Sequence, residues 1–106
     1  MVNFNFDNIS NTLHCRFTGR LDTENILKIS ETVEEKLKGH SANDQQKSFS
    51  VVFDIAQVDY IASAFIRVCI KSVQQTGEGN FSVLNASPLI KKTFKIAGLD
   101  KELNVS

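Results

Sequence analysis

Residues 49–65, FSVVFDIAQVDYIASAF, contain the pattern that decides the fold. Residues 49–55 form a continuous run of β-forming residues, which is typical of a strand that is covered on both faces. Residues 56–62 are interpreted as a loop with apolar anchors. Ser63 is then a natural N-cap for a helix that runs to about Thr76. The stretch therefore predicts a buried strand whose carboxyl end leads through a loop into a helix.

The alternation of strand and helix continues toward the C-terminus. The polar residues 77–80 end the helix, and residues 81–85 form the next strand. Ser87 is a cap, and Pro88 occupies the first position of a helix that ends at Gly98. We expect residues 99–105 to form a short final helix or a tail.

On the N-terminal side, two segments alternate apolar and polar residues with period two, as half-buried strands do. They are residues 2–7 and 13–18, and the short polar link between them predicts a hairpin. Asp22 or Thr23 then caps a helix, in which Leu27 widens the apolar stripe and which Gly39 stops. Residues 40–48 are polar and are expected to form a surface loop.

The predicted order is ββαβαβα. Strands that alternate with helices are parallel and joined by right-handed crossovers, and the hairpin adds an antiparallel edge. The sequence therefore predicts an α/β fold with a mixed sheet in a single domain over residues 1–106.

Charge and hydropathy exclude several classes of function. The 12 basic residues balance 12 acidic ones, whereas nucleic-acid binding normally needs a basic excess. Lys91, Lys92 and Lys95 form a local basic patch, which is interpreted as a solvated helix face. No segment approaches the roughly 18–20 apolar residues of a membrane span, and the N-terminus lacks the pattern of a secretory signal. We therefore expect a cytoplasmic protein with no membrane span and no direct nucleic-acid contact.

The residues that usually carry catalysis form no recognisable pattern. Cys15 and Cys69 lie among apolar residues and are expected to be buried thiols, and neither His14 nor His40 has ligand partners at metal spacing. Gly77-Glu78-Gly79 follows a helix rather than a strand, so it is no phosphate loop. The sequence predicts no catalytic residue, no metal and no cofactor, and hence a protein that is not an enzyme.

The end of the central strand is the candidate site. Ligands of parallel α/β sheets bind beyond the carboxyl ends of strands, and Ala62 and Ala64 beside Ser63 would let a partner approach closely. The candidate site is therefore a protein-binding surface at the start of the second helix.

The same stretch resembles the STAS domain, and within it the anti-sigma-factor antagonists, whose motif is approximately D-L-S-x-V-x-x-I-D-S-S-G. Asp54, Val58, Ile61 and Ser63 match this motif without a gap. Residues 19–22 resemble that family's G-x-L-D, and residues 81–85 with 90–99 resemble its closing strand and helix. The resemblance spans nearly the whole chain and implies a mixed sheet with helices mainly on one face.

The resemblance also implies a bacterial partner-switching regulator that acts in signal transduction and transcription. In that family the serine equivalent to Ser63 is phosphorylated by an anti-sigma factor that is itself a serine kinase of the histidine-kinase-like ATPase type. A PP2C-type phosphatase reverses the modification, and the unmodified form binds the anti-sigma factor. The chain departs from the motif at Ala62, Ala64 and Phe65, and Arg67 stands where a small residue is usual.

A phosphate at a helix N-terminus is compatible with folding, because free N–H groups and the helix dipole favour negative charge. It would also place nearly two charges at the centre of a binding surface. Arg67 could meet that phosphate or an acidic partner, or be an exposed solvating side chain, and Phe65 could be an anchor or a core residue. The expected partner-binding residues are Asp22, Tyr60, Ala62, Ser63, Ala64 and Arg67.

Two alternatives to this regulator remain open at this point. Ser63 could be a plain N-cap without modification. The chain could then be a constitutive, non-phosphorylated STAS module in a signalling assembly. From another class, it could be a small nucleotide-binding α/β protein, although it has no phosphate loop.

Overall fold

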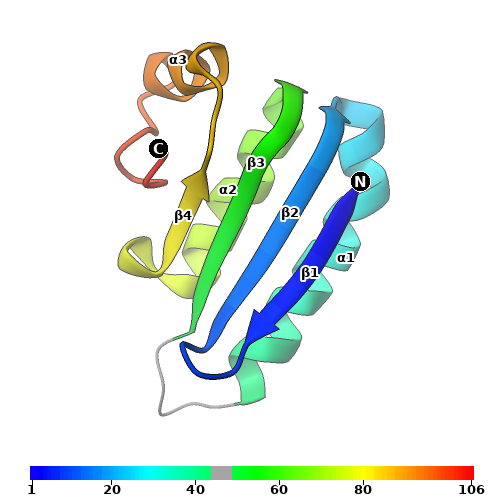
Figure 1. Ribbon diagram of the computed structural model, residues 1–106, viewed down its shortest axis with the longest axis vertical. Helices are drawn as coiled ribbons and strands as arrows, with labels where there is room; N and C mark the ends of the chain where they lie inside the picture. Colours follow the sequence, from blue (N-terminus) through cyan, green and yellow to red (C-terminus); the bar gives the residue numbers. More distant parts are fainter. Residues whose placement is uncertain (44–48) are drawn as a thin grey trace.

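The computed structural model describes residues 1–43 and 49–106 (Figure 1). Its four-stranded sheet has the order β1-β2-β3-β4, in which β1 is antiparallel to β2 and the other pairs are parallel. This confirms the predicted mixed α/β fold with an N-terminal hairpin. The elements in chain order are β1 (Val2–Asp7), β2 (Thr12–Leu21), α1 (Thr23–Asn43), β3 (Ser50–Ile61), α2 (Ser63–Thr76), the 3₁₀ turn η1 (Glu78–Asn80), β4 (Phe81–Leu84) and α3 (Pro88–Ile96).

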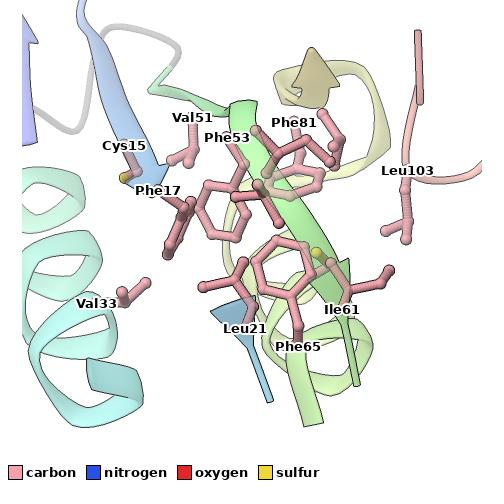
Figure 2. Packing of buried hydrophobic residues seen from close by; sticks show 14 of the residues in the cluster. Cys15, Phe17, Leu21, Val33, Val51, Phe53, Ile61, Phe65, Phe81 and Leu103 are labelled. Atoms are coloured by element: carbon pink, nitrogen blue, oxygen red, sulfur yellow. The ribbon is translucent and has the colours of Figure 1, made fainter. Parts of the chain in front are cut away.

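Helices α1 and α2 cover one face of the sheet, and α3 lies beyond the carboxyl end of β4 (Figure 1). Between the sheet and these two helices lies a core that is rich in phenylalanine (Figure 2). The ring of Phe53 packs edge-on against Phe17 and Phe81, at centroid distances of 4.9 Å in both cases. Burial of apolar side chains on this one face thus determines which face of the sheet the helices cover.

No helix of the described residues covers the opposite face of the sheet (Figure 1). The side chains of β3 alternate between buried and partly exposed over its first half, with Val52 and Asp54 on the open side. The prediction that this strand is covered on both faces is therefore wrong. β3 behaves as a half-buried strand in which even the open face carries β-forming side chains such as Val52.

Strand β3 is also longer than predicted. It continues to Ile61, so the expected loop at residues 56–62 is largely strand. The reason is that β2 also extends, to Leu21, and pairs with β3 as far as Leu21↔Ile61, with irregularities after Arg16 and Gly19. Hydrogen bonds to β2 thus satisfy the backbone N–H and C=O groups in this part of β3, although its sequence does not alternate regularly between apolar and polar residues.

Helix α1 does not stop at Gly39 but continues to Asn43. A glycine inside a helix costs only about 1 kcal/mol relative to alanine, and tertiary contacts outweigh that cost here. The ring of His40 stacks on Phe6 at 4.2 Å between centroids. The loop expected at residues 40–48 is therefore wrong for 40–43, and the rest of it lies outside the described residues.

The third helix begins as predicted. Ser87 is its N-cap and accepts a hydrogen bond at Oγ from the amide of Ile90, and Pro88 is the first helical residue. After α3 the chain forms turns rather than a further helix. Val105 bridges to Val83 in parallel, and the amide of Ser106 donates to the Val83 carbonyl at 2.9 Å. The end of the chain thus covers the outer edge of β4.

Candidate functional site

The starts of α1 and α2 lie side by side at the carboxyl ends of β2 and β3. Leu21 and Ile61, the last residues of the two strands, are paired in register. The amide of Ala62 donates to the Leu21 carbonyl at 2.9 Å. The structure therefore brings the expected site residues Asp22 and Ser63 to one edge of the sheet, where parallel sheets collect their ligands.

The start of α1 is held by side-chain hydrogen bonds. Asp22 accepts a hydrogen bond at Oδ1 from the amide of Asn25 at 2.9 Å, so of the two predicted candidates Asp22, and not Thr23, is the N-cap. Asn25 Nδ2 donates in turn to the Arg20 carbonyl at 2.8 Å, and Arg20 Nε lies 3.5 Å from Asp22 Oδ2. Oδ1 of Asp22 therefore caps α1, while its other carboxylate oxygen, Oδ2, faces Arg20.

Arg20 is a site residue that the sequence reasoning missed. Its guanidinium lies over the ring of Tyr60, 3.9 Å from the centroid, and so joins the ends of β2 and β3 through their side chains. Tyr60 is 40% exposed. Arg20 lies within residues 19–22, which resemble the G-x-L-D segment of the family, so its position could have been noticed in the sequence. Its pairing with Tyr60 depends on a strand register that the sequence does not show.

No side chain of the described residues caps the start of α2. Ala62 is in the N-cap position with extended backbone angles, and the first turn contains no acidic residue. Ser63 is the first helical residue and is exposed. The prediction that Ser63 is the N-cap is therefore wrong, because the extension of β3 to Ile61 leaves Ala62 as the residue between strand and helix.

The remaining site residues divide between core and surface. Phe65 is fully buried, with its ring 5.3 Å from that of Phe17, so the core alternative is correct for it. Ala64 and the exposed Arg67 line a groove of about 220 Å³ between α1 and α2. Leu27 lines the same groove and is 71% exposed, so its assignment to the apolar stripe facing the core is wrong.

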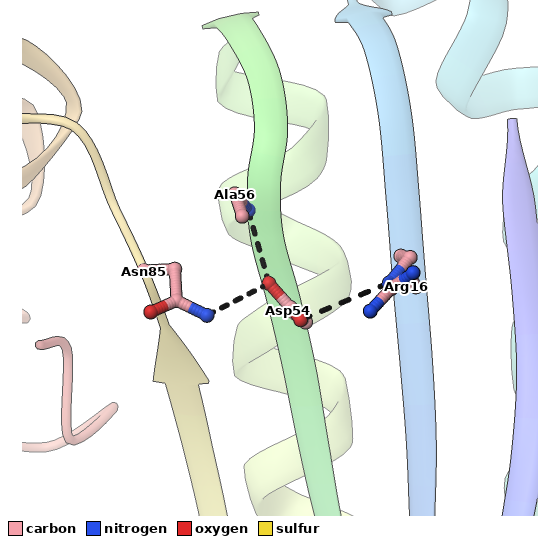
Figure 3. Close-up of polar contacts among 4 residues, drawn as sticks. All are labelled: Arg16, Asp54, Ala56 and Asn85. Atoms are coloured by element: carbon pink, nitrogen blue, oxygen red, sulfur yellow. Dashed lines mark hydrogen bonds and ion pairs between the residues drawn. The ribbon is translucent and has the colours of Figure 1, made fainter.

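The other residues of the strand-end motif are structural. Val58 and Ile61 belong to the core. Asp54 lies on the open face of the sheet, where it accepts hydrogen bonds from the Ala56 amide and Asn85 Nδ2 and pairs with Arg16 (Figure 3). Partial burial would raise the pKa of Asp54, but these hydrogen bonds and the charge of Arg16 outweigh it and lower the pKa below its usual value. Of the four matched motif positions, Ser63 is thus the exposed one beside the helix start.

The two cysteines are buried and free, as predicted. Burial raises the pKa of the Cys15 thiol to about 12 and also raises that of Cys69. Both are therefore poor nucleophiles at neutral pH, since the thiolate is the reactive form. Within residues 1–43 and 49–106, no group of three His, Cys, Asp or Glu side chains could hold a metal ion, and no helix is long and apolar enough to cross a membrane.

Several solved structures share the fold of this chain. The unphosphorylated form of the anti-sigma-factor antagonist SpoIIAA matches with a TM-score of 0.66 at 14% identity, over 91% of this chain and 83% of that one. The phosphorylated form of the Bacillus cell-fate determinant SpoIIAA matches with a TM-score of 0.66 at 14% identity, over 100% and 91% of the two chains.

An anti-sigma-factor antagonist (STAS) domain protein from Planctomyces limnophilus matches with a TM-score of 0.78 at 15% identity, over 99% of this chain and 87% of that one. No curated protein sequence matches the chain significantly. The family model of the STAS domain matches residues 3–106. The chain therefore belongs to the STAS domain family.

Proposed function

We propose that this STAS domain is a partner-switching regulator of the anti-sigma-factor-antagonist type, controlled by phosphorylation of Ser63. Its partner would be an anti-sigma factor that is also a serine kinase of the histidine-kinase-like ATPase type, with a PP2C-type phosphatase as the reverse enzyme. The surface that binds the partner would consist of Asp22, Tyr60, Ala62, Ser63, Ala64 and Arg67.

The observation that carries the proposal is the open start of α2. The Ser63 side chain is exposed and makes no hydrogen bond to the described residues, and no side chain caps the helix. The first N–H groups of the helix therefore have no side-chain acceptor. A hydroxyl in this position is accessible to a kinase, and a phosphate on it would meet the positive end of the helix dipole and backbone N–H groups that no side chain caps in the described part of the chain.

Arg67 supports the same assignment. It lies four residues after Ser63 on α2, so the two side chains share one face of the helix. Arg67 is exposed and forms no ion pair with the described residues. Its guanidinium could therefore pair with a phosphate on Ser63, which would let the domain stay folded in both states.

The neighbouring surface suits a protein partner in the unmodified state. The stacked pair of Arg20 and Tyr60 presents a partly exposed ring at the carboxyl ends of β2 and β3, the edge of the sheet at which α2 begins. Tyrosine and arginine are typical anchors of protein interfaces. A phosphate at Ser63 would add charge and bulk to the centre of this surface, so we expect it to reduce binding by at least about tenfold.

Incubation with ATP and the histidine-kinase-like ATPases of the same organism, followed by intact-mass measurement, tests the modification. We expect one phosphate on the parent chain and none on Ser63→Ala, with Ser82→Ala as a matched control that is still modified. Calorimetric titration of the partner into both forms then measures the switch. Stable partner binding without any mass gain would instead establish the constitutive module.

A further inference from the structure

A groove outside the Ser63 surface lies between α3 and the last residues of the chain. Its volume is about 720 Å³, and Pro88, Ile96 and Val105 supply its apolar walls. Lys91, Lys92 and Lys95 line it as well. The groove therefore combines apolar surface with a row of positive charges on a single helix.

The three lysines are not neutralised by the protein itself. All three are exposed, and none forms an ion pair with another described residue. Helix α3 contains no acidic residue, and among the described residues that line the groove Asp100 is the one acid. Two lysines of α1 behave differently, since Lys28 and Lys38 each pair with a glutamate four residues earlier. The charge of the whole chain is balanced, so the α3 lysines are a local excess.

Large apolar side chains lie beside these charges. Ile96 is 78% exposed and Leu89 is 72% exposed, and both lie on the solvent side of α3, opposite the buried Ile90 and Phe94. On a helix of 3.6 residues per turn, Leu89, Lys92 and Ile96 fall in one stripe, with Lys91 and Lys95 along its side. The solvent-facing surface of α3 therefore carries apolar and basic side chains next to one another.

We propose that this groove binds an acidic segment of a protein partner whose carboxylates pair with the three lysines and whose apolar side chains pack on Ile96, Pro88 and Val105. Charge complementarity selects an acidic occupant. The zero net charge of the chain disfavours nucleic acid as the occupant, because phosphate binding normally needs a basic excess. Concavity and the small number of exposed apolar residues disfavour a membrane surface, which needs a broad apolar face.

This site is independent of the Ser63 switch, since none of its residues belongs to the surface around the start of α2. A partner with two contact regions could therefore stay attached through α3 while phosphorylation of Ser63 releases the other region. Two linked contacts reinforce each other through effective concentration without any new interaction.

Amide-resolved NMR titration of the full ¹⁵N-labelled chain tests the proposal. The probe is a short acetylated peptide of Glu and Leu residues, compared with a Glu and Ser peptide, a Lys and Leu peptide and vesicles containing phosphatidylglycerol. We expect shifts at Lys91, Lys92, Lys95, Ile96 and Val105 with the first probe alone. Ile96→Ser should weaken that binding about tenfold, as loss of a buried isoleucine contact predicts.

The triple variant Lys91→Glu/Lys92→Glu/Lys95→Glu should abolish binding, and Lys28→Glu on α1 is the matched control that should leave it unchanged. All these side chains are exposed, so an unchanged melting temperature shows that each variant folds. Equal binding of the Glu and Ser peptide, shifts elsewhere in the chain, preference for vesicles, or no binding to any probe would each overturn the proposal.

Discussion

Two helices begin side by side at one edge of the sheet, and they are held there in opposite ways. The start of α1 depends on polar side chains, in which Asp22 caps the helix and Asn25 binds back to the Arg20 carbonyl. The start of α2 receives no cap from any side chain that the structure describes, and it is anchored by Phe65, which is fully buried two residues into the helix. The polar side chains at the start of α1 thus already form hydrogen bonds within the fold. The Ser63 hydroxyl at the start of α2 forms none with the described residues.

This difference explains how a modification at one helix start could leave the fold intact. A helix that depends on a side-chain cap loses stability when that cap is altered. A helix anchored by a buried ring can accept a new charge at its exposed first residue, because the ring and the charge lie on different sides of it. We therefore expect a covalent modification to be tolerated at the start of α2 rather than at the start of α1.

The largest effect should come from Phe65→Ala, which removes the anchor of α2. Deleting a fully buried phenylalanine costs about 3–5 kcal/mol, through lost burial and the cavity that remains. Denaturant unfolding of the variant measures it. Leu27→Ala at the neighbouring exposed position is the control and should change stability by less than about 0.5 kcal/mol. A loss below about 1 kcal/mol for Phe65→Ala would show that α2 is anchored elsewhere.

Asp22→Ala should cost about 1 kcal/mol, because it removes the cap of α1. The same unfolding experiment measures this loss. Asp22→Asn keeps a side-chain oxygen for the Asn25 amide while removing the charge that faces Arg20, so it should retain most of the stability. Equal losses in the two variants would mean that the ion pair with Arg20, rather than the cap, stabilises this end of the helix.

Ala62→Asp should stabilise the chain by about 0.5–1 kcal/mol, since it supplies the cap and the negative charge that α2 lacks. For a domain of this size we expect a rise in melting temperature of roughly 4 °C, read by circular dichroism. Ala62→Leu, which offers no oxygen, is the control. A lower melting temperature for Ala62→Asp would show that the partly buried position leaves no room for the carboxylate.

The smallest effect should come from Ser63→Ala, which we expect to change stability by less than about 0.5 kcal/mol. The Ser63 hydroxyl makes no hydrogen bond within the described part of the chain, so its removal leaves no donor or acceptor unpaired. Thermal unfolding checks this. A loss near 1 kcal/mol would mean that the hydroxyl acts as a cap in solution, and the contrast between the two helix starts would then disappear.

The helix caps show how far local sequence predicts the ends of helices. The cap at Ser87 was predicted correctly, and Asp22 was one of the two predicted caps of α1, because the cap, the residue after it and the following apolar spacing all lie within a few positions. Ser63 fulfilled the same local criteria and was still not a cap. Its position depends on where β3 ends, which the partner strand β2 decides through its own length and register.

The sequence by itself determined the order of elements, the mixed sheet, the buried cysteines and the family, because periodicity, turn residues and motif spacing are properties of the chain alone. Only the tertiary structure decided that Ala62 precedes α2, that Arg20 stacks on Tyr60 and that Leu27 faces solvent. Strand register and helix packing involve residues that are distant in sequence. Their contribution to the free energy of folding exceeds local preferences such as that of Ser63 for an N-cap and that of Gly39 for a helix end.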